Sequence, residues 1–210
     1  MNPIFEFFFG QYLEYETIDV VLEIVAVFFG FLSVWFSKQN KVLVFPTGMI
    51  STIIFVYLLL KWQLLGDMLI NAYYFIMSVY GWYVWTKKVD EEHVTPISRT
   101  TLSEKKISAA IFFTTLIFVY LVYVTFNKWT SWVAYIDTIT TAIFFVGMWL
   151  MARRKIENWI FWIIGDIISV PLYFYKGFTF TSLQYLGFTF IAIFGYLAWK
   201  KNINRKLQTV

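Results

Sequence analysis

Three side chains in the stretch NWIFWIIGDIIS, residues 158–169, have the types and the spacing needed to bind a small solute. Trp159, Trp162 and Asp166 stand at positions i, i+3 and i+7, so a helix would place them on one face over about 10 Å. Two indole rings can enclose a flat heteroaromatic ring, and they attract a cationic ring most strongly. A carboxylate one turn away can neutralise a positive charge or accept hydrogen bonds from ribose hydroxyls. The pattern therefore indicates a site for a cationic aromatic solute of sugar size.

The same residues also allow structural interpretations. Trp159 lies close to one end of its apolar run, where tryptophans that anchor a helix at the membrane surface are common. Asp166 could be a structural acid bonded to Ser51 or Thr52, which we expect at a similar depth on another helix. An unpaired charge at that depth costs at least about 2.5–3.5 kcal/mol, so Asp166 should face protein or a watery cavity.

The composition is that of a membrane protein. Hydrophobic residues make up 60% of the 210 residues and charged residues only 14%, whereas a soluble domain carries about 25% charged residues. The chain has no cysteine, and its one histidine, His93, lies in the polar stretch VDEEHVTPISRT. We therefore expect no metal site, no cofactor and no catalytic residues, because candidates for a nucleophile–base pair or for metal ligands are few.

Apolar runs predict an all-α polytopic membrane protein with seven transmembrane helices. Their expected ranges are 19–37, 42–60, 67–86, 106–126, 132–152, 156–175 and 181–199. All of the 17 Lys and Arg residues except Lys61, Lys128 and Lys176 fall on one side of these spans. Because short loops rich in Lys and Arg stay in the cytoplasm, the N-terminus is predicted outside and the C-terminus inside. This placement accounts for the net charge of +4 without a nucleic-acid partner, and it leaves no buried lysine for a retinal Schiff base.

The two halves of the chain resemble each other weakly. YGWYVWTKK ends the third span and FGYLAWKK ends the seventh, which matches Gly81 with Gly195 and Trp85 with Trp199. Three spans and a connector before the second half would give a parallel repeat, an arrangement known in transporters with the site at the repeat interface. The predicted division is an extracytoplasmic segment 1–18, a first three-helix bundle 19–86, a cytoplasmic loop and connector helix 87–131, a second three-helix bundle 132–199 and a cytoplasmic tail 200–210.

Other polar residues within the spans are weaker candidates for contacts with the solute. They are Ser51, Thr52, Asn71, Asp137, Thr141 and Gln184. Asn71, Asp137 and Gln184, together with Glu23, fall in the outer halves of their spans. There they would line an outer vestibule or hold helices together, and for Asn71 and Gln184 helix pairing is slightly favoured.

The run MARRKIENWIFWIIGDIISVPLYFYKG and the motif YGWYVW at the end of the third span resemble the PnuC family of vitamin-precursor transporters. The resemblance covers essentially the whole chain. It implies a SWEET-like 3+1+3 arrangement of helices, a homotrimer with one pathway per protomer, and a place in the bacterial inner membrane. It also implies nicotinamide riboside, a precursor of NAD, as the substrate, carried by facilitated diffusion with alternating access and trapped by phosphorylation in the cytoplasm. The family's binding motif WxxWxxxN, with Asp at the last position in some members, corresponds here to Trp159, Trp162 and Asp166.

Aspartate in place of asparagine leaves two cationic substrates open. Nicotinamide riboside carries a positive pyridinium ring, and thiamine, which relatives of this family carry, has a positive thiazolium ring. Proton or sodium symport through Asp166 and Glu23 is the alternative to facilitated diffusion. The expected partners are thus a small cationic aromatic solute, the lipid bilayer and two further copies of the chain.

Overall fold

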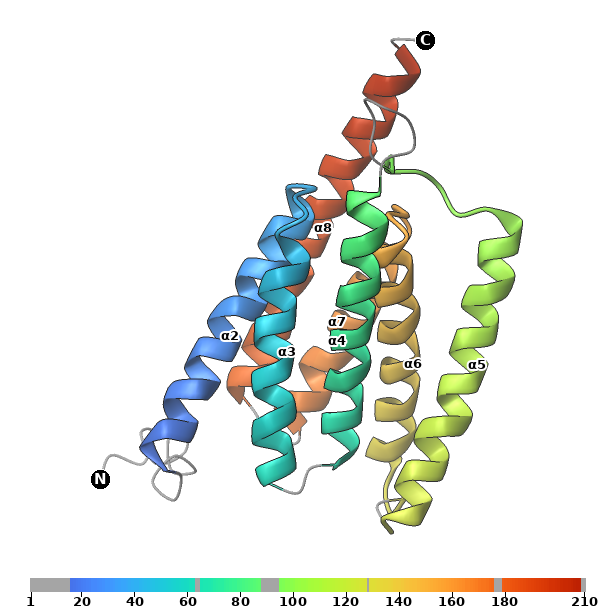
Figure 1. Cartoon of the computed structure of the whole chain (residues 1–210). Coiled ribbons are helices and arrows are strands. Elements are labelled where there is room, and N and C mark those ends of the chain that lie inside the picture. Colours follow the sequence, from blue (N-terminus) through green and yellow to red (C-terminus); the bar gives the residue numbers. More distant parts are fainter. Residues whose placement is uncertain (1–15, 63–64, 88–94, 128, 176–178, 209–210) are drawn as a thin grey trace.

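Seven long helices make up the described part of the chain in a computed structural model that covers residues 16–62, 65–87, 95–127, 129–175 and 179–208 (Figure 1). They are α2 (Thr17–Lys38), α3 (Val44–Lys61), α4 (Leu65–Thr86), α5 (Leu102–Thr125), α6 (Trp132–Ala152), α7 (Asn158–Tyr175) and α8 (Thr179–Gln208). Every predicted boundary lies within four residues of the observed one, except the end of the last helix. Residues 1–15 of the N-terminal segment, His93, Lys88, Lys128 and Lys176 lie outside the described residues.

The two largest differences from the predicted spans have local causes. Helix α5 begins four residues early because Thr101 and Glu104 form a capping box, in which each side chain accepts a hydrogen bond from the other residue's backbone N–H, at 3.3 and 2.9 Å. Helix α8 continues past the predicted end at residue 199 to Gln208. The sequence KKNINRKLQ contains neither glycine nor proline, so nothing in it breaks the helix.

The helices form two groups of three. Within each group, consecutive helices pack side by side: α2 on α3 and α3 on α4, then α6 on α7 and α7 on α8. Contacts of α2 with α8 and of α4 with α6 join the two groups. Helix α5 packs along α6 and barely contacts α4 (Figure 1).

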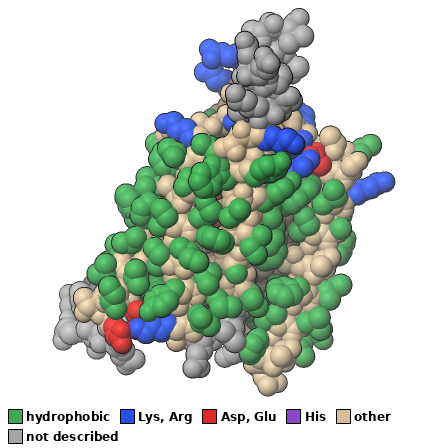
Figure 2. All heavy atoms as spheres, in the orientation of Figure 1, with side chains coloured by type: hydrophobic (Ala, Val, Ile, Leu, Met, Phe, Trp, Pro, Cys, Tyr) green, Lys and Arg blue, Asp and Glu red, His purple; other side chains and the backbone are tan. Residues whose placement is uncertain are grey.

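The outer surface of this bundle suits a lipid bilayer. Six of the seven described helices are long and apolar enough to cross a membrane, and α4, with 22 residues, is long enough but less apolar over its described part. Figure 2 shows hydrophobic side chains covering the middle of the molecule, with charged side chains near its two ends. Six helices of this length with an apolar outer surface indicate a multi-pass membrane protein, and helices satisfy the requirement that the backbone be hydrogen-bonded internally within a bilayer.

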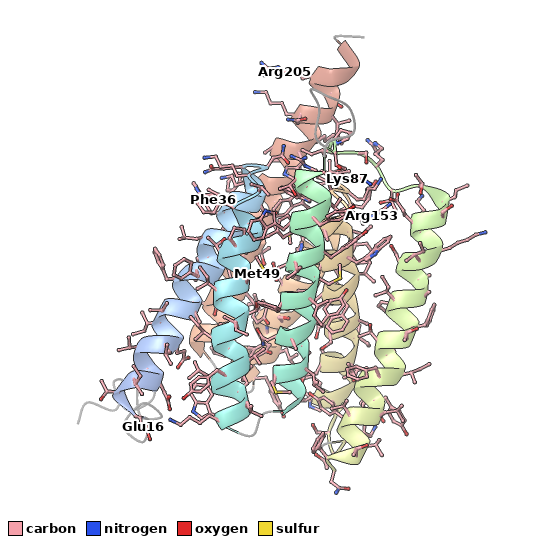
Figure 3. All side chains as sticks on the ribbon, viewed as in Figure 1. Glu16, Phe36, Met49, Lys87, Arg153 and Arg205 are labelled. Atoms are coloured by element: carbon pink, nitrogen blue, oxygen red, sulfur yellow. The ribbon has the colours of Figure 1, made fainter. Side chains whose placement is uncertain are left out.

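Lys and Arg side chains gather at the end of the bundle where α2, α4, α6 and α8 finish, which we call the basic end (Figure 3). Its described members are Lys38, Lys41, Lys87, Arg99, Lys105, Lys106, Arg153, Arg154, Lys155, Lys200, Lys201 and Arg205. At the opposite end, Lys61 forms ion pairs of 2.8 Å with both Glu16 and Asp19. The described cations are therefore divided between the ends in the way that the sequence predicted.

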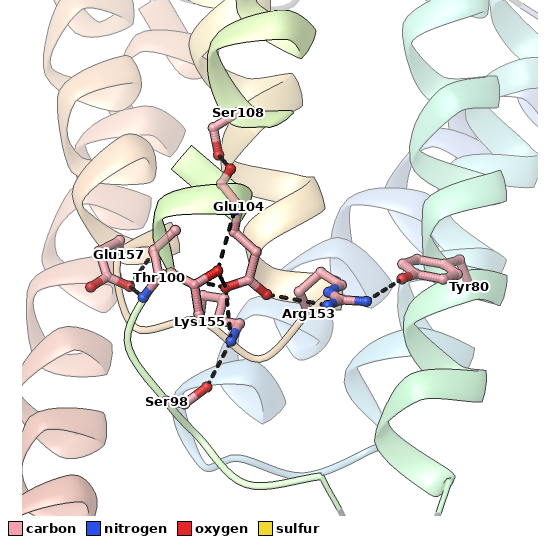
Figure 4. Close-up of polar contacts among 9 residues, drawn as sticks. Tyr80, Ser98, Thr100, Glu104, Ser108, Arg153, Lys155 and Glu157 are labelled. Carbon is pink, nitrogen blue, oxygen red and sulfur yellow. Dashed lines mark hydrogen bonds and ion pairs between the residues drawn. The ribbon is translucent and has the colours of Figure 1, made fainter. Parts of the chain in front are cut away.

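A polar network at the basic end attaches the start of α5 to the turn between α6 and α7 (Figure 4). The carboxylate of Glu104 forms ion pairs with Arg153, at 3.2 Å, and with Lys155, at 3.0 Å. The carboxylate of Glu157 accepts hydrogen bonds from the backbone N–H and the hydroxyl of Thr100, at 3.0 and 2.6 Å. Because α5 packs on α6 and barely contacts α4, these bonds help to fix the position of its first turn.

The burial of Glu104 leads to a stability prediction. Its side chain is only 7% exposed, so Glu104→Gln leaves Lys155 and Arg153 without their shared anion and should lower thermal stability by the equivalent of about 1–3 kcal/mol. The control is Glu16→Gln, whose side chain is 69% exposed and whose ion pair should contribute at most about 1 kcal/mol. The measurement is the midpoint of thermal unfolding in detergent. Equal shifts for the two variants would contradict the structural role of Glu104.

Candidate functional site

Trp159, in the first turn of α7, is enclosed at the basic end and only 1% exposed. Its ring lies edge-on to Trp199, with centroids 5.6 Å apart and planes at 89°. It also lies directly against Gly195, where an added Cβ would be 2.6 Å from the indole. Burial within the protein rules out the lipid-interface interpretation of Trp159. In this conformation its side chain is part of the packed core, and stacking on a solute stays a prediction that requires this cluster to open.

The packing of Trp159 has a counterpart in the first half of the chain. Phe45 lies edge-on to Trp85, with centroids 5.1 Å apart and planes at 89°. An added Cβ at Gly81 would be 2.2 Å from the Phe45 ring. The counterparts are 114 positions apart in every case: Phe45 and Trp159, Gly81 and Gly195, and Trp85 and Trp199. Ser37 and Met151 have the same separation. The pairs that the sequence matched therefore make corresponding contacts in the two halves.

Two indole hydrogen bonds cross between the groups of helices. Trp85 Nε1, on α4, donates to the carbonyl of Met151 on α6 at 3.1 Å, and Trp199 Nε1, on α8, donates to the carbonyl of Ser37 on α2 at 3.0 Å. The two donors are 114 positions apart, and so are the two acceptors. The last helix of each group is thus bonded to the end of the first helix of the other.

Trp162, one turn further along α7, has a different environment. Its ring is half-buried, 5.4 Å from Phe144 on α6 at an angle of 31° and 6.3 Å from Tyr74 on α4 at 54°. Gly147 provides room for it, since an added Cβ there would be 3.5 Å from the indole. Aromatic groups from two other helices, α4 and α6, therefore lie beside a partly accessible indole.

Asp166 follows on the same face of α7 and is 2% exposed. Tyr74 on α4 and Tyr185 on α8 lie close enough to interact with its charge. None of the ion pairs among the described residues involves Asp166. A buried carboxylate without a cation is costly, so the arrangement suits a ligand that brings a positive charge or hydroxyl groups.

The alternative partners predicted for Asp166 have other contacts. Thr52 donates to the carbonyl of Gly48 on its own helix at 2.8 Å. Ser51 faces α2, where an added Cβ at Gly30 would be 3.2 Å from its hydroxyl oxygen. No bond from either hydroxyl to Asp166 is found among the described contacts, so the structural interpretation of this acid has no support from them.

The other weak candidates are spread over several helices. Asp137 accepts a hydrogen bond of 3.0 Å from Tyr123, which joins α6 to α5 on the outer side of the bundle. Thr141 is buried and donates to the carbonyl of Asp137 at 2.7 Å. Asn71, on α4, and Gln184, on α8, are half-buried. Only Trp162 and Asp166 of the predicted residues share the surroundings described above.

Three residues of these surroundings were absent from the prediction. Tyr74, Phe144 and Tyr185 come from α4, α6 and α8, and Phe144 lies 6.0 Å from Tyr185 with nearly parallel rings. The chain has 24 Phe and 14 Tyr residues, so neither residue type nor spacing distinguishes these three from the rest. Only the packing of helices distant in sequence identifies them.

The close contact between Gly195 and Trp159 can be tested by substitution. Gly195→Ala forces a methyl group against the indole and should destabilise the protein by about 1–3 kcal/mol. The matched control on the same helix is Gly187→Ala, whose Cβ would be 3.9 Å from Phe31, an ordinary contact, and which should be neutral or stabilising by up to about 1 kcal/mol. The midpoint of thermal unfolding in detergent measures the stability of both variants. An unchanged midpoint for Gly195→Ala would contradict the close contact between Gly195 and the Trp159 ring.

Comparisons with known proteins show the family and the fold of the chain. The family described as "Nicotinamide mononucleotide transporter" matches residues 20–201. The nicotinamide riboside transporter PnuC of Escherichia coli (strain K12) is 24% identical over 205 residues, which cover 85% of this chain and 84% of that protein. The riboflavin/roseoflavin transporter RibM of Streptomyces davaonensis is 26% identical over 130 residues, 59% of this chain and 58% of RibM.

A solved structure has the same fold. The crystal structure of the vitamin B3 transporter PnuC superposes with a TM-score of 0.66 at 23% identity, over 97% of this chain and 91% of that one. At that identity the match supports the fold alone. The family match covers most of the chain, from the second residue of the predicted first span to the basic end of α8. The chain therefore belongs to the nicotinamide mononucleotide transporter family of membrane transporters.

Proposed function

We propose that this transporter carries nicotinamide riboside. The observation that supports the proposal best is the buried Asp166, which has no ion pair with any described residue and lies near the aromatic surroundings of Trp162. The pyridinium ring would pack against Trp162 and its aromatic neighbours, where a desolvated cation–π contact contributes about 2 kcal/mol. Asp166 would neutralise the positive ring or accept hydrogen bonds from the ribose. Trp159 would join as a second stacking surface once the cluster at the basic end opens.

The same charge argues against the mononucleotide in the family's description. A phosphate group near Asp166 would place two negative charges in a site of low dielectric, which costs several kcal/mol. All Lys and Arg side chains of the described residues lie at helix ends or in the turns between helices, so none of them is available inside the bundle to bind a phosphate. The relative named a nicotinamide riboside transporter has the substrate that this site would accept.

Two other cargoes remain to be separated from nicotinamide riboside. Riboflavin is suggested by the name of the relative RibM, but its ring system is neutral and gives Asp166 no charge to balance. Thiamine is cationic and aromatic, so it satisfies the charge requirement, but it lacks the sugar. The lack of a positive charge thus disfavours riboflavin as the substrate. The ribose distinguishes nicotinamide riboside from thiamine, since both are cations.

The proposed architecture is a SWEET-like 3+1+3 arrangement with parallel repeats, with α2–α4 and α6–α8 as bundles and α5 as the connector. Two observations support this architecture. The hydrogen bonds of Trp85 and Trp199 correspond to each other at a separation of 114 positions, and α5 lies at the periphery, packed on α6. In the bacterial inner membrane, the basic end would face the cytoplasm and the N-terminus the outside. The proposed assembly is a homotrimer with one pathway per protomer.

The proposed mechanism is facilitated diffusion by alternating access, with one group of helices rocking against the other and phosphorylation in the cytoplasm trapping the solute. Proteoliposomes without any ion gradient should then take up labelled nicotinamide riboside down its own gradient. Empty liposomes serve as the control. Uptake that appears only with an imposed proton or sodium gradient would favour symport through Asp166 and Glu23 instead.

The role of Asp166 predicts a charge preference that can be measured directly. Wild-type protein should bind nicotinamide riboside more tightly than its reduced form, whose dihydropyridine ring is uncharged, and Asp166→Asn should weaken that preference about tenfold or more. The control is Asp19→Asn, the same change at an acid that pairs with Lys61 at the opposite end of the bundle. Isothermal titration of the purified protein gives both affinities, with thiamine and riboflavin titrated in parallel. An unchanged preference in Asp166→Asn would refute the proposed role of the carboxylate.

A further inference from the structure

Ser169, on α7, has a buried hydroxyl group that finds no hydrogen-bond partner among the described residues. The side chain is 1% exposed, and among the described residues its Oγ is the only buried hydroxyl oxygen left unpaired. Several other buried hydroxyls in the helices, among them those of Ser108, Thr138 and Thr189, donate to the carbonyl four residues earlier at 2.7–2.9 Å. An unpaired buried polar group is unfavourable for folding, so its presence needs an explanation.

Ser169 lies on the face of α7 that carries the candidate site. It follows Trp162 by seven residues, two helical turns, so the two side chains point in nearly the same direction. Asp166 lies between them, about 4.5 Å from Ser169 along the helix axis. Trp162, Asp166 and Ser169 therefore form a row that runs from an aromatic group through a carboxylate to a free hydroxyl.

We propose that Ser169 is a further substrate-binding residue, which hydrogen-bonds a sugar hydroxyl of the solute beside the Asp166 carboxylate. This assignment rests on the proposed function, because it requires a solute with a sugar. A carboxylate can only accept hydrogen bonds, whereas a serine hydroxyl can both donate and accept. Each ribose hydroxyl can both donate and accept a hydrogen bond. Asp166 can accept from one hydroxyl while Ser169 donates to its neighbour, so the two side chains together satisfy groups that a single acid cannot.

The order of the three side chains fits the order of groups in such a solute. A positive ring held at Trp162 would have its charge near Asp166, and a sugar attached to that ring would extend toward Ser169. A site that recognises only a cationic ring would need no polar group at this depth. The structure thus assigns specificity for the ribosyl part to Ser169, and specificity for the charge to Asp166.

The test is a set of titrations with analogues that lack one hydroxyl. Purified full-length protein is titrated with nicotinamide riboside and with its 2′-deoxy and 3′-deoxy analogues, for the wild type and for Ser169→Ala. We expect Ser169→Ala to weaken binding of nicotinamide riboside about threefold to tenfold. One of the deoxy analogues should bind the wild type equally weakly and lose nothing further in Ser169→Ala, because the bond is already missing.

The matched control is Ser182→Ala on α8. Ser182 is also buried, but its hydroxyl donates to the carbonyl of Val170 at 2.8 Å. Its substitution should lower the midpoint of thermal unfolding and leave the affinity within about twofold, since this bond serves the fold. Ser169→Ala should do the reverse, with an unchanged or higher midpoint and a lower affinity, because removing an unpaired hydroxyl does not destabilise the folded state.

Two outcomes would overturn the role of Ser169 and leave the cargo intact. One is wild-type affinity of Ser169→Ala for nicotinamide riboside, which would mean that bound water alone satisfies the hydroxyl. The other is an equal loss for the riboside and both deoxy analogues, which would mean that the residue acts through the fold. Failure of the wild type to bind nicotinamide riboside at all would instead refute the proposed function, and this assignment with it.

Discussion

Two indole hydrogen bonds at the basic end, from Trp85 to Met151 and from Trp199 to Ser37, hold the two groups of helices together. They fix the ends of α2, α4, α6 and α8 relative to one another. The Trp159 ring is packed against this assembly, so the rotation of α7 about its own axis is determined at its first turn. Side chains three and seven residues later must then face the interior of the bundle. The position of the candidate site is therefore a consequence of how the basic end packs.

The same contacts belong to a packed cluster of buried side chains around Trp159 at the basic end. Arg154 adds to this packing: its guanidinium donates to the side chain of Asn40 at 3.0 and 2.9 Å, and both residues have left-handed backbone conformations, with φ of 59° and 58°. Burial lowers the pKa of Arg154 to about 10. In the proposed cycle these contacts must separate before a solute can leave, which would also expose the Trp159 ring.

The sequence was sufficient for features that depend on one helix at a time. Apolar runs predicted seven helices, charge placement predicted the basic end, and helical spacing predicted that Trp162 and Asp166 share a face. The sequence was insufficient for features that depend on the packing of two helices. The spacing within α7 predicts which face carries Trp159, but it does not predict that Gly195 lets α8 approach closely and bury the indole ring. The capping box of α5 is visible in the sequence as TLSE, residues 101–104, but the apolar run by itself predicts a helix start at residue 106.

The two halves of the chain differ at the positions of the candidate site. The positions 114 residues before Trp162 and Asp166 are Gly48 and Thr52. Around Gly48 the first group is packed through small side chains, since an added Cβ would be 3.0 Å from the hydroxyl oxygen of Ser33 and 3.5 Å from that of Ser78. Such contacts let helices approach closely, and Gly48 itself has no side chain that could stack on a solute. At the corresponding place in the second group, the Trp162 ring lies beside Gly147 and keeps an aromatic surface near the buried Asp166. In the proposed site, a solute that needs both would therefore be recognised by α7 and by the helices that face it, among them α4 of the first group, which contributes Tyr74.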